Sequence, residues 1–388
     1  MRRTFVFACN KHVGRKPRKG SAMRILIFLL CLCFICPGSL AAKRQRGPKT
    51  NPVPVSVAMQ SPVLTGKVNL VWQHKNLPEV DLSKLPPLEG VNVVAPCWYD
   101  LADAGGSLKD KTVPGYVTLA HAKGYQVWPL ITSGFNPKMF HQLLEDKQAR
   151  QFVIAQLLAE AKKHQIDGFN LDFENIRDDD RDKLTGFVKE IVTALRAENL
   201  KVSMDVTFPG GSAYWSKCYD HEALAREVDY LMVMAYDQYT PSMHQPGPTA
   251  ALDWVERGLK NTLKLVPSNK LVLGMPLYMR LWTRDLETGN VNGKTLSMPA
   301  AEKVTVKASL LSTWKAEYDD EQALLRCSYE EGTKHFDYWL EDANSIRRKA
   351  ALIKKYDLAG AATWRKGFET EDVWPVIAAA VKAETTQK

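Results

Sequence analysis

This 388-residue chain has few cysteines outside its first 42 residues, and the apolar run within those 42 residues is short. Three cysteines remain, Cys97, Cys218 and Cys327, so at most one disulfide can form and the paired spacing of a zinc site is missing. Buried free thiols are the simpler interpretation. The apolar run Ile25–Cys36 has about 12 residues, fewer than the roughly 20 that a membrane-spanning helix needs. We therefore expect neither a disulfide framework nor a stable membrane span.

Acidic residues are absent from residues 1–42, which hold eight lysines and arginines. Without these eight, the formal net charge of the chain falls from +9 to +1. The basicity therefore belongs to the leader, and the rest of the chain has no excess of positive charge with which to bind nucleic acid.

The leader has the order of an export signal. Met23-Arg24 precede the apolar run, and small residues follow at Ala41-Ala42. We expect a signal over residues 1–42, with Met23 as an alternative start, and a monomer that is secreted or held in the cell envelope. Cysteines inside the apolar run leave a lipid anchor open as a less favoured alternative. Residues 43–64 are basic and then rich in Pro, Val and Ser, which indicates a linker or a strand-like arm.

Eight β-rich apolar segments alternate with helical patterns from residue 65 onward. Strands are expected at Val68–Gln73, Val91–Pro96, Tyr125–Thr132, Gly168–Glu174, Lys201–Phe208, Tyr230–Tyr236, Leu271–Tyr278 and Leu358–Trp364. Helices are expected at Ala149–His164, Asp180–Glu198, Ala250–Leu265 and Asp342–Tyr356. This alternation predicts an α/β fold, a closed (β/α)₈ TIM barrel over residues 65–384.

The connection between the seventh and eighth expected strands is too long for one helix. About 60 residues separate Tyr278 from Asp342, and they contain the β-like pieces Lys303–Leu310 and Gln322–Tyr329. We expect a small α+β insertion on the rim of the barrel, over about residues 284–340.

Polar side chains recur at every second position of the expected strand Gly168–Glu174. Because strand side chains alternate between faces, Asn170, Asp172 and Glu174 share the face toward the barrel interior. Active sites of such barrels lie at the carboxyl ends of the strands. Two carboxyl groups this close keep one protonated near neutral pH, as a general acid requires. A polar interior network without catalysis is the alternative interpretation.

The segment Asp167-Gly168-x-Asn170-x-Asp172-x-Glu174 resembles the D-G-x-D-x-D-x-E signature of glycoside hydrolase family 18, the chitinase-like barrels. From about Val68 to Trp374, further segments resemble family strands in the same order: Val91–Trp98, Val228–Asp237, Leu273–Tyr278 and Ala361–Trp364. The most similar subgroup is the bacterial spore-cortex and cell-wall type, which shares Asn170, Gly247-Pro248-Thr249-Ala250 and Trp339-Leu340-Glu341-Asp342-Ala343.

The resemblance implies substrate-assisted hydrolysis of β-1,4 bonds next to N-acetylglucosamine, with retention of configuration. It implies that Glu174 is the general acid and base, that Asp172 orients the substrate's acetamide, and that Tyr236 donates a hydrogen bond to the acetamide oxygen. Substrate-binding roles are expected for Asn170, Asp237, Tyr278, Trp364 and Trp98. The substrate is a glycan of peptidoglycan fragments or of chitin, and the sequence leaves this choice and that between endo and exo cleavage open.

The chain departs from the family pattern at three places. Asn170 replaces the usual Asp and removes one negative charge from the interior, Met279 stands where many members have Gly, and Ser133-Gly134-Phe135 matches the third-strand motif only loosely. Because both Asp172 and Glu174 are present, we favour an enzyme over the alternatives, a lectin-like barrel of the same fold or a barrel acting on another sugar.

No metal and no cofactor are expected. The acidic run at residues 178–182 lacks the Gly and the Glu of a calcium loop, and it suits the start of a helix better. His221-Glu222 is not followed by the second His of a zinc-protease motif, and no phosphate-binding loop is present.

Overall fold

The computed structural model describes residues 61–74, 81–84 and 86–382. The expected export signal at 1–42, its alternative start at Met23 and most of the expected linker lie outside these residues. Residues 61–64, the end of that linker, are in neither a helix nor a strand, and the Gln126 side chain donates a hydrogen bond to the carbonyl of Pro62 (2.8 Å).

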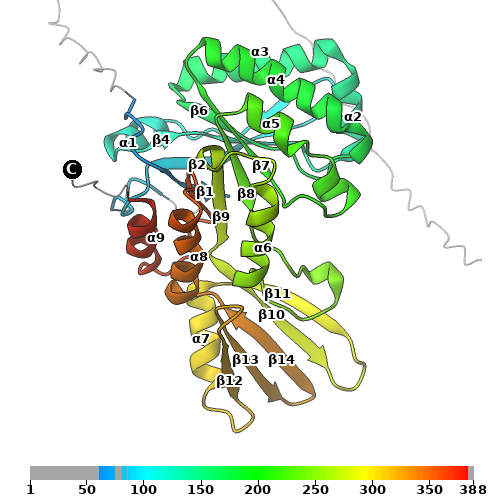
Figure 1. Ribbon diagram of the computed structural model, residues 1–388, viewed down its shortest axis with the longest axis vertical. Coiled ribbons are helices and arrows are strands. Elements are labelled where there is room, and N and C mark those ends of the chain that lie inside the picture. Colours follow the sequence, from blue (N-terminus) through cyan, green and yellow to red (C-terminus); the bar gives the residue numbers. More distant parts are fainter. Residues whose placement is uncertain (1–60, 75–80, 85, 383–388) are drawn as a thin grey trace, which may run out of the picture. The chain divides into compact units, whose positions relative to one another are not determined.

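Eight parallel strands form a closed barrel, as the sequence predicts (Figure 1). The order around the barrel is β1-β15-β9-β8-β7-β6-β5-β2, and pairing of β1 with β2 closes it. The strands are β1 (Val68–Gln73), β2 (Val93–Leu101), β5 (Leu130–Thr132), β6 (Gly168–Asp172), β7 (Lys201–Val206), β8 (Tyr230–Met234), β9 (Leu271–Pro276) and β15 (Gly360–Trp364). The short strands β3 (Leu108–Asp110) and β4 (Gln126–Val127) pair with β2.

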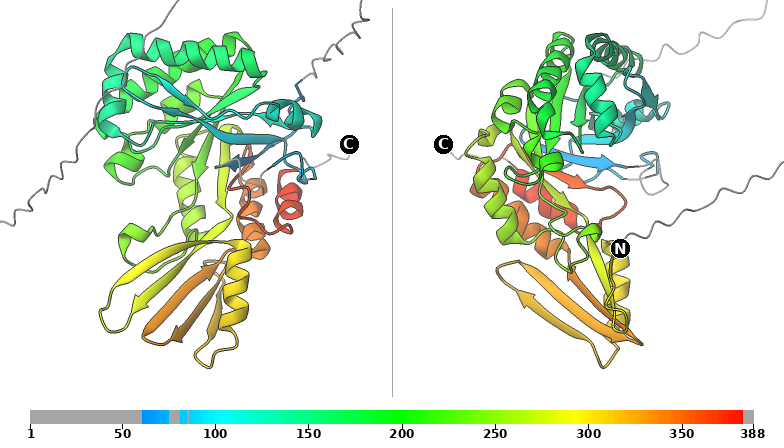
Figure 2. Two further views of the ribbon diagram at one scale, coloured as in Figure 1. Left: turned by 180° about the vertical axis from the view of Figure 1, so that it is seen from behind. Right: turned by 90° about the vertical axis from the view of Figure 1, so that its right-hand side faces the viewer.

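Helices connect the strands and cover the outside of the barrel (Figure 2). They are α1 (Tyr116–Ala122), α2 (Pro137–Glu145), α3 (Lys147–His164), α4 (Arg181–Ala197), α5 (His221–Glu227), α6 (Leu252–Thr262), α8 (Ala343–Lys355) and α9 (Val373–Val381). Single turns lie at Asp178–Asp180, Ala213–Lys217, Pro241–Met243 and Ser268–Lys270. The four expected helices are confirmed to within two or three residues at each end, since each buries one apolar face against the strands.

The insertion between the seventh and eighth barrel strands is a five-stranded antiparallel sheet with one helix (Figure 1). Its elements are β10 (Tyr278–Asp285), β11 (Val291–Ser297), α7 (Met298–Ala308), β12 (Lys315–Asp319), β13 (Leu324–Glu331) and β14 (Lys334–Leu340), in the sheet order β11-β10-β14-β13-β12. The expected β piece at Gln322–Tyr329 is confirmed as part of β13.

The expected β piece at Lys303–Leu310 is wrong, because most of it belongs to helix α7. Its valines favour a strand locally, but Ser297 caps the helix by accepting a hydrogen bond from the backbone N–H of Ala300 (3.3 Å). Thr305 then meets the hydroxyl of Tyr338 on the sheet at 2.8 Å. The N-cap and packing on the sheet outweigh the strand propensity of the valines.

A buried ion pair stands where the insertion returns to the barrel. Lys349 on α8 lies 2.8 Å from Glu341, which follows β14, and neither side chain is exposed to solvent. The hydroxyl of Ser345 also donates to Glu341 (2.7 Å). These bonds fix the end of the insertion against the last barrel helix.

Candidate active site

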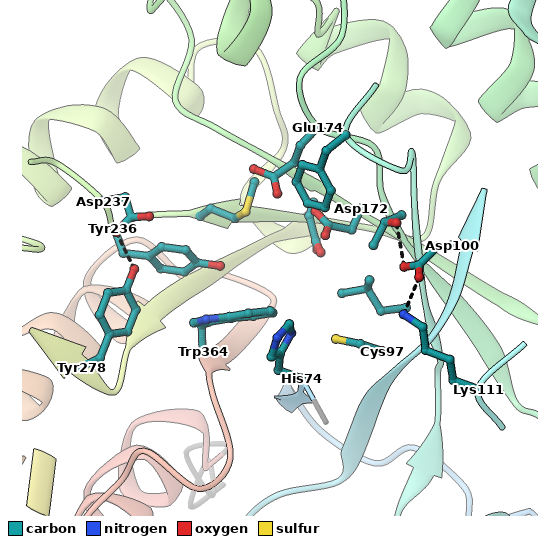
Figure 3. A pocket seen from close by; sticks show the side chains of 15 residues that line it. His74, Cys97, Asp100, Lys111, Asp172, Glu174, Tyr236, Asp237, Tyr278 and Trp364 are labelled. Carbon is teal, nitrogen blue, oxygen red and sulfur yellow. Dashed lines mark hydrogen bonds and ion pairs between the residues drawn. The ribbon is translucent and has the colours of Figure 1, made fainter. Parts of the chain in front are cut away.

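A pocket of about 280 Å³ opens at the carboxyl ends of the barrel strands (Figure 3). Most of the expected site residues line it, and they come from four different strand ends. The lining residues are His74, Cys97, Asp100, Lys111, Leu130, Thr132, Phe135, Asp172, Glu174, Asp205, Met234, Tyr236, Asp237, Tyr278 and Trp364. This position is the one at which barrel enzymes carry their active sites.

Strand β6 and the two residues after it supply the acidic centre. The alternation predicted from the sequence holds, because Phe169, Leu171 and Phe173 are buried in the core between strands and helices. Phe173 lies parallel to Phe187 of α4, with ring centroids 6.0 Å apart. The opposite face therefore turns Asp172 and Glu174 into the pocket (Figure 3).

Asp172 and Glu174 lie side by side in the pocket, and the pKa of both carboxyl groups is raised well above its usual value. Burial is the main cause that raises the pKa of Glu174, and the nearby charge of Asp172 adds to it. Burial and the charge of Asp205 raise the pKa of Asp172. A carboxyl group that keeps its proton at neutral pH suits proton donation to a leaving group.

Tyr236, Asp237 and Tyr278 form the wall across the pocket from Asp172 (Figure 3). The hydroxyl of Tyr278 donates to Asp237 (2.6 Å), and so does the guanidinium of Arg280 (2.6 Å). Burial raises the pKa of Tyr236 well above its usual value, so its hydroxyl stays a hydrogen-bond donor. The Tyr236 hydroxyl points toward the space between the carboxyl groups and Trp364 (Figure 3).

The side chain of Trp364, at the end of β15, lies on the side of the pocket opposite Glu174 (Figure 3). Its ring centroid is 5.8 Å from that of His74 and 6.0 Å from that of Trp72. These two rings hold the indole in place, and its flat face can stack on a sugar ring.

Two of the expected substrate-binding residues do not line the pocket. Trp98 is buried in the core and meets Tyr116 edge to face, with centroids 5.1 Å apart. The structure therefore contradicts a place for Trp98 in the groove. The register of β2 shifts between Cys97 and Tyr99, where Cys97 faces the pocket and Trp98 packs in the core beside Tyr99. Asn170 lies inside the barrel, where its amide oxygen accepts from the indole N–H of Trp72 (2.7 Å).

The other two departures from the family pattern fall in different places. Met279 is fully buried in the core, whereas Phe135 is about half exposed and lines the pocket. The first residue of the signature, Asp167, lies at the other end of β6, where it accepts from the backbone N–H of Val127 (2.7 Å) and meets the ring of His121 (2.8 Å). Asp167 therefore stabilises the base of the barrel.

Several lining residues were not found from the sequence. Asp205, on β7, is the most consequential, and its signal is the alternation of the polar residues Ser203 and Asp205 with the apolar residues of that strand. Asp100 and Lys111 form an ion pair at the far end of the pocket, and Thr132 donates to Asp100 (3.0 Å). These contacts join strands that are distant in the sequence.

A second hollow of about 460 Å³ adjoins the first at Glu174. It shares Glu174, Met234, Tyr236 and Asp237 with the first pocket. Its outer part is made of hydroxyl and apolar side chains: Thr207, Ser212, Trp215, Thr240, Ser242 and Met243. Glu174 is therefore one of four residues that line both spaces.

The described part of the chain holds no group of three His, Cys, Asp or Glu side chains placed to hold a metal ion. The acidic run at 178–182 opens α4, and Arg177 pairs with Asp179 and lies 4.0 Å from Asp180. The cysteines within the described residues are free. None of the helices in that same part is long and apolar enough to cross a membrane.

A family model described as "Glycosyl hydrolases family 18" matches residues 103–368. The chain belongs to this family. It is therefore a glycosidase, and the carboxyl pair in the pocket is the family 18 signature in its expected place.

Curated family 18 relatives come from bacteria and animals. The glycosylase YvbX of Bacillus subtilis is 26% identical over 67% of this chain and 76% of its own length. The cortical fragment-lytic enzyme of B. subtilis is 23% identical over 71% of this chain and 65% of its own length. Human di-N-acetylchitobiase is 27% identical over 60% of this chain and 69% of its own length.

Solved structures of other proteins share the fold. A chitinase from Chromobacterium violaceum has a TM-score of 0.71 and 22% identity, covering 82% of this chain and 99% of its own. The spore cortex-lytic enzyme SleL of Bacillus cereus has a TM-score of 0.73 and 20% identity, covering 83% of this chain and 76% of its own. At these identities the likeness establishes the barrel alone.

Proposed function

We propose that this family 18 glycosidase hydrolyses β-1,4 bonds next to N-acetylglucosamine, in peptidoglycan fragments or chitin-like chains. The observation that carries the proposal is the position of Glu174 beside Asp172, opposite the hydroxyl of Tyr236 and the face of Trp364 (Figure 3). These four side chains thus surround one space, and each can make a different contact with an N-acetylated sugar.

The reaction begins with proton transfer from Glu174 to the glycosidic oxygen. The acetamide oxygen of the bound sugar attacks the anomeric carbon as the bond to the leaving group breaks, which yields an oxazoline-like intermediate. Glu174 then takes a proton from water as the water opens this intermediate on the same face, and configuration is retained. The substrate supplies the nucleophile, so one protein carboxyl group serves as both acid and base.

Asp172 and Tyr236 hold the acetamide during these steps. The Oδ1 atom of Asp172 is buried and has no hydrogen-bond partner among the described residues, so it is available to the acetamide N–H. The Tyr236 hydroxyl would donate to the acetamide oxygen as charge develops there. Asp237 and Tyr278 would bind hydroxyl groups, and Trp364 would form the floor under the sugar ring.

The names of the relatives suit both substrate classes. Of the proteins described above, one is named a spore cortex-lytic enzyme, one a cortical fragment-lytic enzyme, and others chitinase or chitobiase. Together with the leader expected at residues 1–42, they support action outside the cytoplasm, either in the medium or in the cell envelope.

The test is product analysis on a panel of N-acetylglucosamine oligomers and muropeptides, with the anomeric form of the first product followed by NMR. We expect cleavage next to N-acetylglucosamine, a β-anomer as the first product and tight inhibition by a thiazoline analogue of N-acetylglucosamine. Binding without turnover on every glycan would favour the lectin-like alternative. An inverted product, or cleavage of oligomers without acetamido groups, would refute the assisted mechanism.

Tyr236→Phe is expected to lower kcat on the cleaved oligomer by roughly 10²-fold, because it removes one donor from the developing charge. Steady-state kinetics on the wild type and the variant measure this loss. Tyr318→Phe, on strand β12 of the insertion, is the matched control and should retain wild-type kinetics. Equal rates for Tyr236→Phe and the wild type would remove Tyr236 from the mechanism.

A further inference from the structure

Asp205 is a buried acidic residue that the proposed mechanism leaves without a role. It is 2% exposed, yet it lines the pocket beside the two carboxyl groups that carry the chemistry. A buried carboxyl group without a cationic partner destabilises the folded state. Such a residue in an enzyme pocket calls for a chemical explanation.

Strand register places Asp205 directly beside Asp172. In the pairing of β6 with β7, Asn170 lies opposite Ser203 and Leu171 opposite Met204. The next step of the ladder brings Asp172 and Asp205 together on the interior face, on strands about 4.8 Å apart. Asp205, Asp172 and Glu174 thus form a row, with Asp172 in the middle.

The amide of Asn170 orients Asp205 without adding a charge. Because the Asn170 oxygen accepts from Trp72, its amino group must point the other way, and it donates to Asp205 (2.8 Å) and to Ser203 (3.1 Å). Asp205 therefore accepts a neutral hydrogen bond on one oxygen, and this bond leaves its carboxyl group free to titrate.

Most titratable groups around the row are acids; Lys111, which lines the same pocket, pairs with Asp100, and His74 lines the pocket beside Trp364. The titratable groups that act on Asp205 or feel its charge are Asp172 and Glu174 from β6, Tyr236 from the end of β8, Cys97 from β2, and Tyr219. Burial raises the pKa of Asp205 well above its usual value, and the charge of Glu174 raises it further. The three carboxyl groups therefore cannot all be ionised near neutral pH.

We propose that Asp205 is a positioning residue that shares one proton with Asp172 and withdraws negative charge from Glu174 during the reaction. This inference rests on the proposed function. In the resting enzyme, one proton lies on Glu174 and a second between Asp172 and Asp205. When Glu174 gives its proton to the glycosidic oxygen, the second proton moves to Asp172, which donates a hydrogen bond to the new Glu174 carboxylate. The remaining negative charge then resides on Asp205, one strand away.

Asp205→Asn tests this role because asparagine keeps the shape and can still accept the bond from Asn170. Without Asp205, the negative charge stays on Asp172 when Glu174 ionises, and two adjacent carboxylates repel each other. We expect kcat to fall by roughly 10²-fold with KM changed by less than about threefold, as befits a group that acts only in the transition state. The alkaline limb of the pH profile of kcat/KM should move to higher pH, because Glu174 then loses its proton less readily.

The exchange variant Asn170→Asp/Asp205→Asn is the rescue. In this variant the carboxyl group is at position 170 and the amide is at position 205. The hydrogen bonds are kept, because Trp72 can still donate to the side chain at 170 and the amide at 205 can donate to the carboxylate at 170. We expect most of the lost kcat to return and the alkaline limb to move back. Ser203→Ala, which removes the other partner of the Asn170 amino group, should leave the pH profile unchanged.

Thermal unfolding gives a measurement that does not depend on activity. Because folding raises the pKa of Asp205, the folded protein binds more protons than the unfolded chain near neutral pH, and its stability falls as pH rises. Asp205→Asn should therefore have a higher Tm than the wild type at pH 8, and the difference should shrink toward pH 4. A lower Tm at pH 8 would show a purely structural role and would overturn the proposal.

An unmoved pH profile in Asp205→Asn, or an exchange variant as slow as the single variant, would also overturn the proposal. If the wild type cleaves none of the glycans, the proposed function fails by itself. The unfolding experiment then still decides whether Asp205 titrates with Asp172.

Discussion

Replacing Glu174 by Gln should reduce kcat by roughly 10³- to 10⁴-fold on any glycan that the wild type cleaves, because the variant keeps the shape of the side chain and loses its proton. The pKa of Glu174 is raised by burial and by Asp172, so the wild-type group is an acid at the pH where the enzyme must work. Glu174 and Asp237 are the carboxyl groups that line both hollows, and the Asp237 carboxylate already accepts hydrogen bonds from Tyr278 and Arg280. KM should change little, since the contacts of Tyr236, Asp237 and Trp364 remain.

Single-turnover and steady-state kinetics on one cleaved oligomer measure this loss, and thermal unfolding shows whether the variant is folded. Glu190→Gln is the matched control: Glu190 lies on α4, where it pairs with Arg150 at 3.0 Å, far in the fold from the strand ends. It should retain wild-type turnover. Equal product formation by Glu174→Gln and the wild type would remove Glu174 from the role of general acid.

Lys349→Met should destabilise the protein by about 3–5 kcal/mol, because it leaves Glu341 buried without its cation. That is a large share of the roughly 5–15 kcal/mol by which folded proteins are stable. Burial already raises the pKa of Glu341 even with Lys349 present. Without Lys349, the ionised carboxyl group would destabilise the folded state further. Chemical denaturation of wild type and variant at pH 7 measures the difference.

The pH dependence of this loss has a definite sign. Without Lys349 the pKa of Glu341 rises further, so the carboxyl group becomes neutral at mildly acidic pH and the penalty shrinks there. The deficit should therefore be smaller at pH 5 than at pH 8. The double variant Lys349→Met/Glu341→Leu should recover most of the stability, since apolar side chains can replace a buried ion pair. A single variant as stable as the wild type at pH 8 would show that the pair does not anchor the insertion.

Loss of this pair should also affect the pocket. Tyr278, which begins the insertion, donates to Asp237, and its pKa is raised mainly by burial and by Asp237, with a smaller effect of the charge of Glu341. The insertion therefore supplies one wall of the substrate site as well as a sheet outside the barrel. The ion pair between Glu341 and Lys349 of α8 keeps that wall in position.

The sequence determined those features that depend on local periodicity. Alternation along residues 168–174 separates Asp172 and Glu174 from the buried side chains of Phe169, Leu171 and Phe173, whichever way the strand is packed. The order of strands and helices likewise predicts a parallel barrel, and the barrel places the carboxyl end of each strand at one rim. The acidic pair could therefore be placed at the active-site rim in advance, whereas the roles of Tyr236 and Trp364 were implied by the resemblance to family 18.

The tertiary structure alone decided which side chains meet across strands. Asp205 lies beside Asp172 because β6 and β7 pair in one register, and that register is not visible in either strand alone. Asp205 also places an acidic group in the barrel interior, where this chain has Asn170 and most family members have Asp. Trp98 packs in the core where the register of β2 shifts, and α7 formed where local propensity favoured a strand. Periodicity within a segment can be read from the local sequence, whereas contacts between segments form only when the barrel closes.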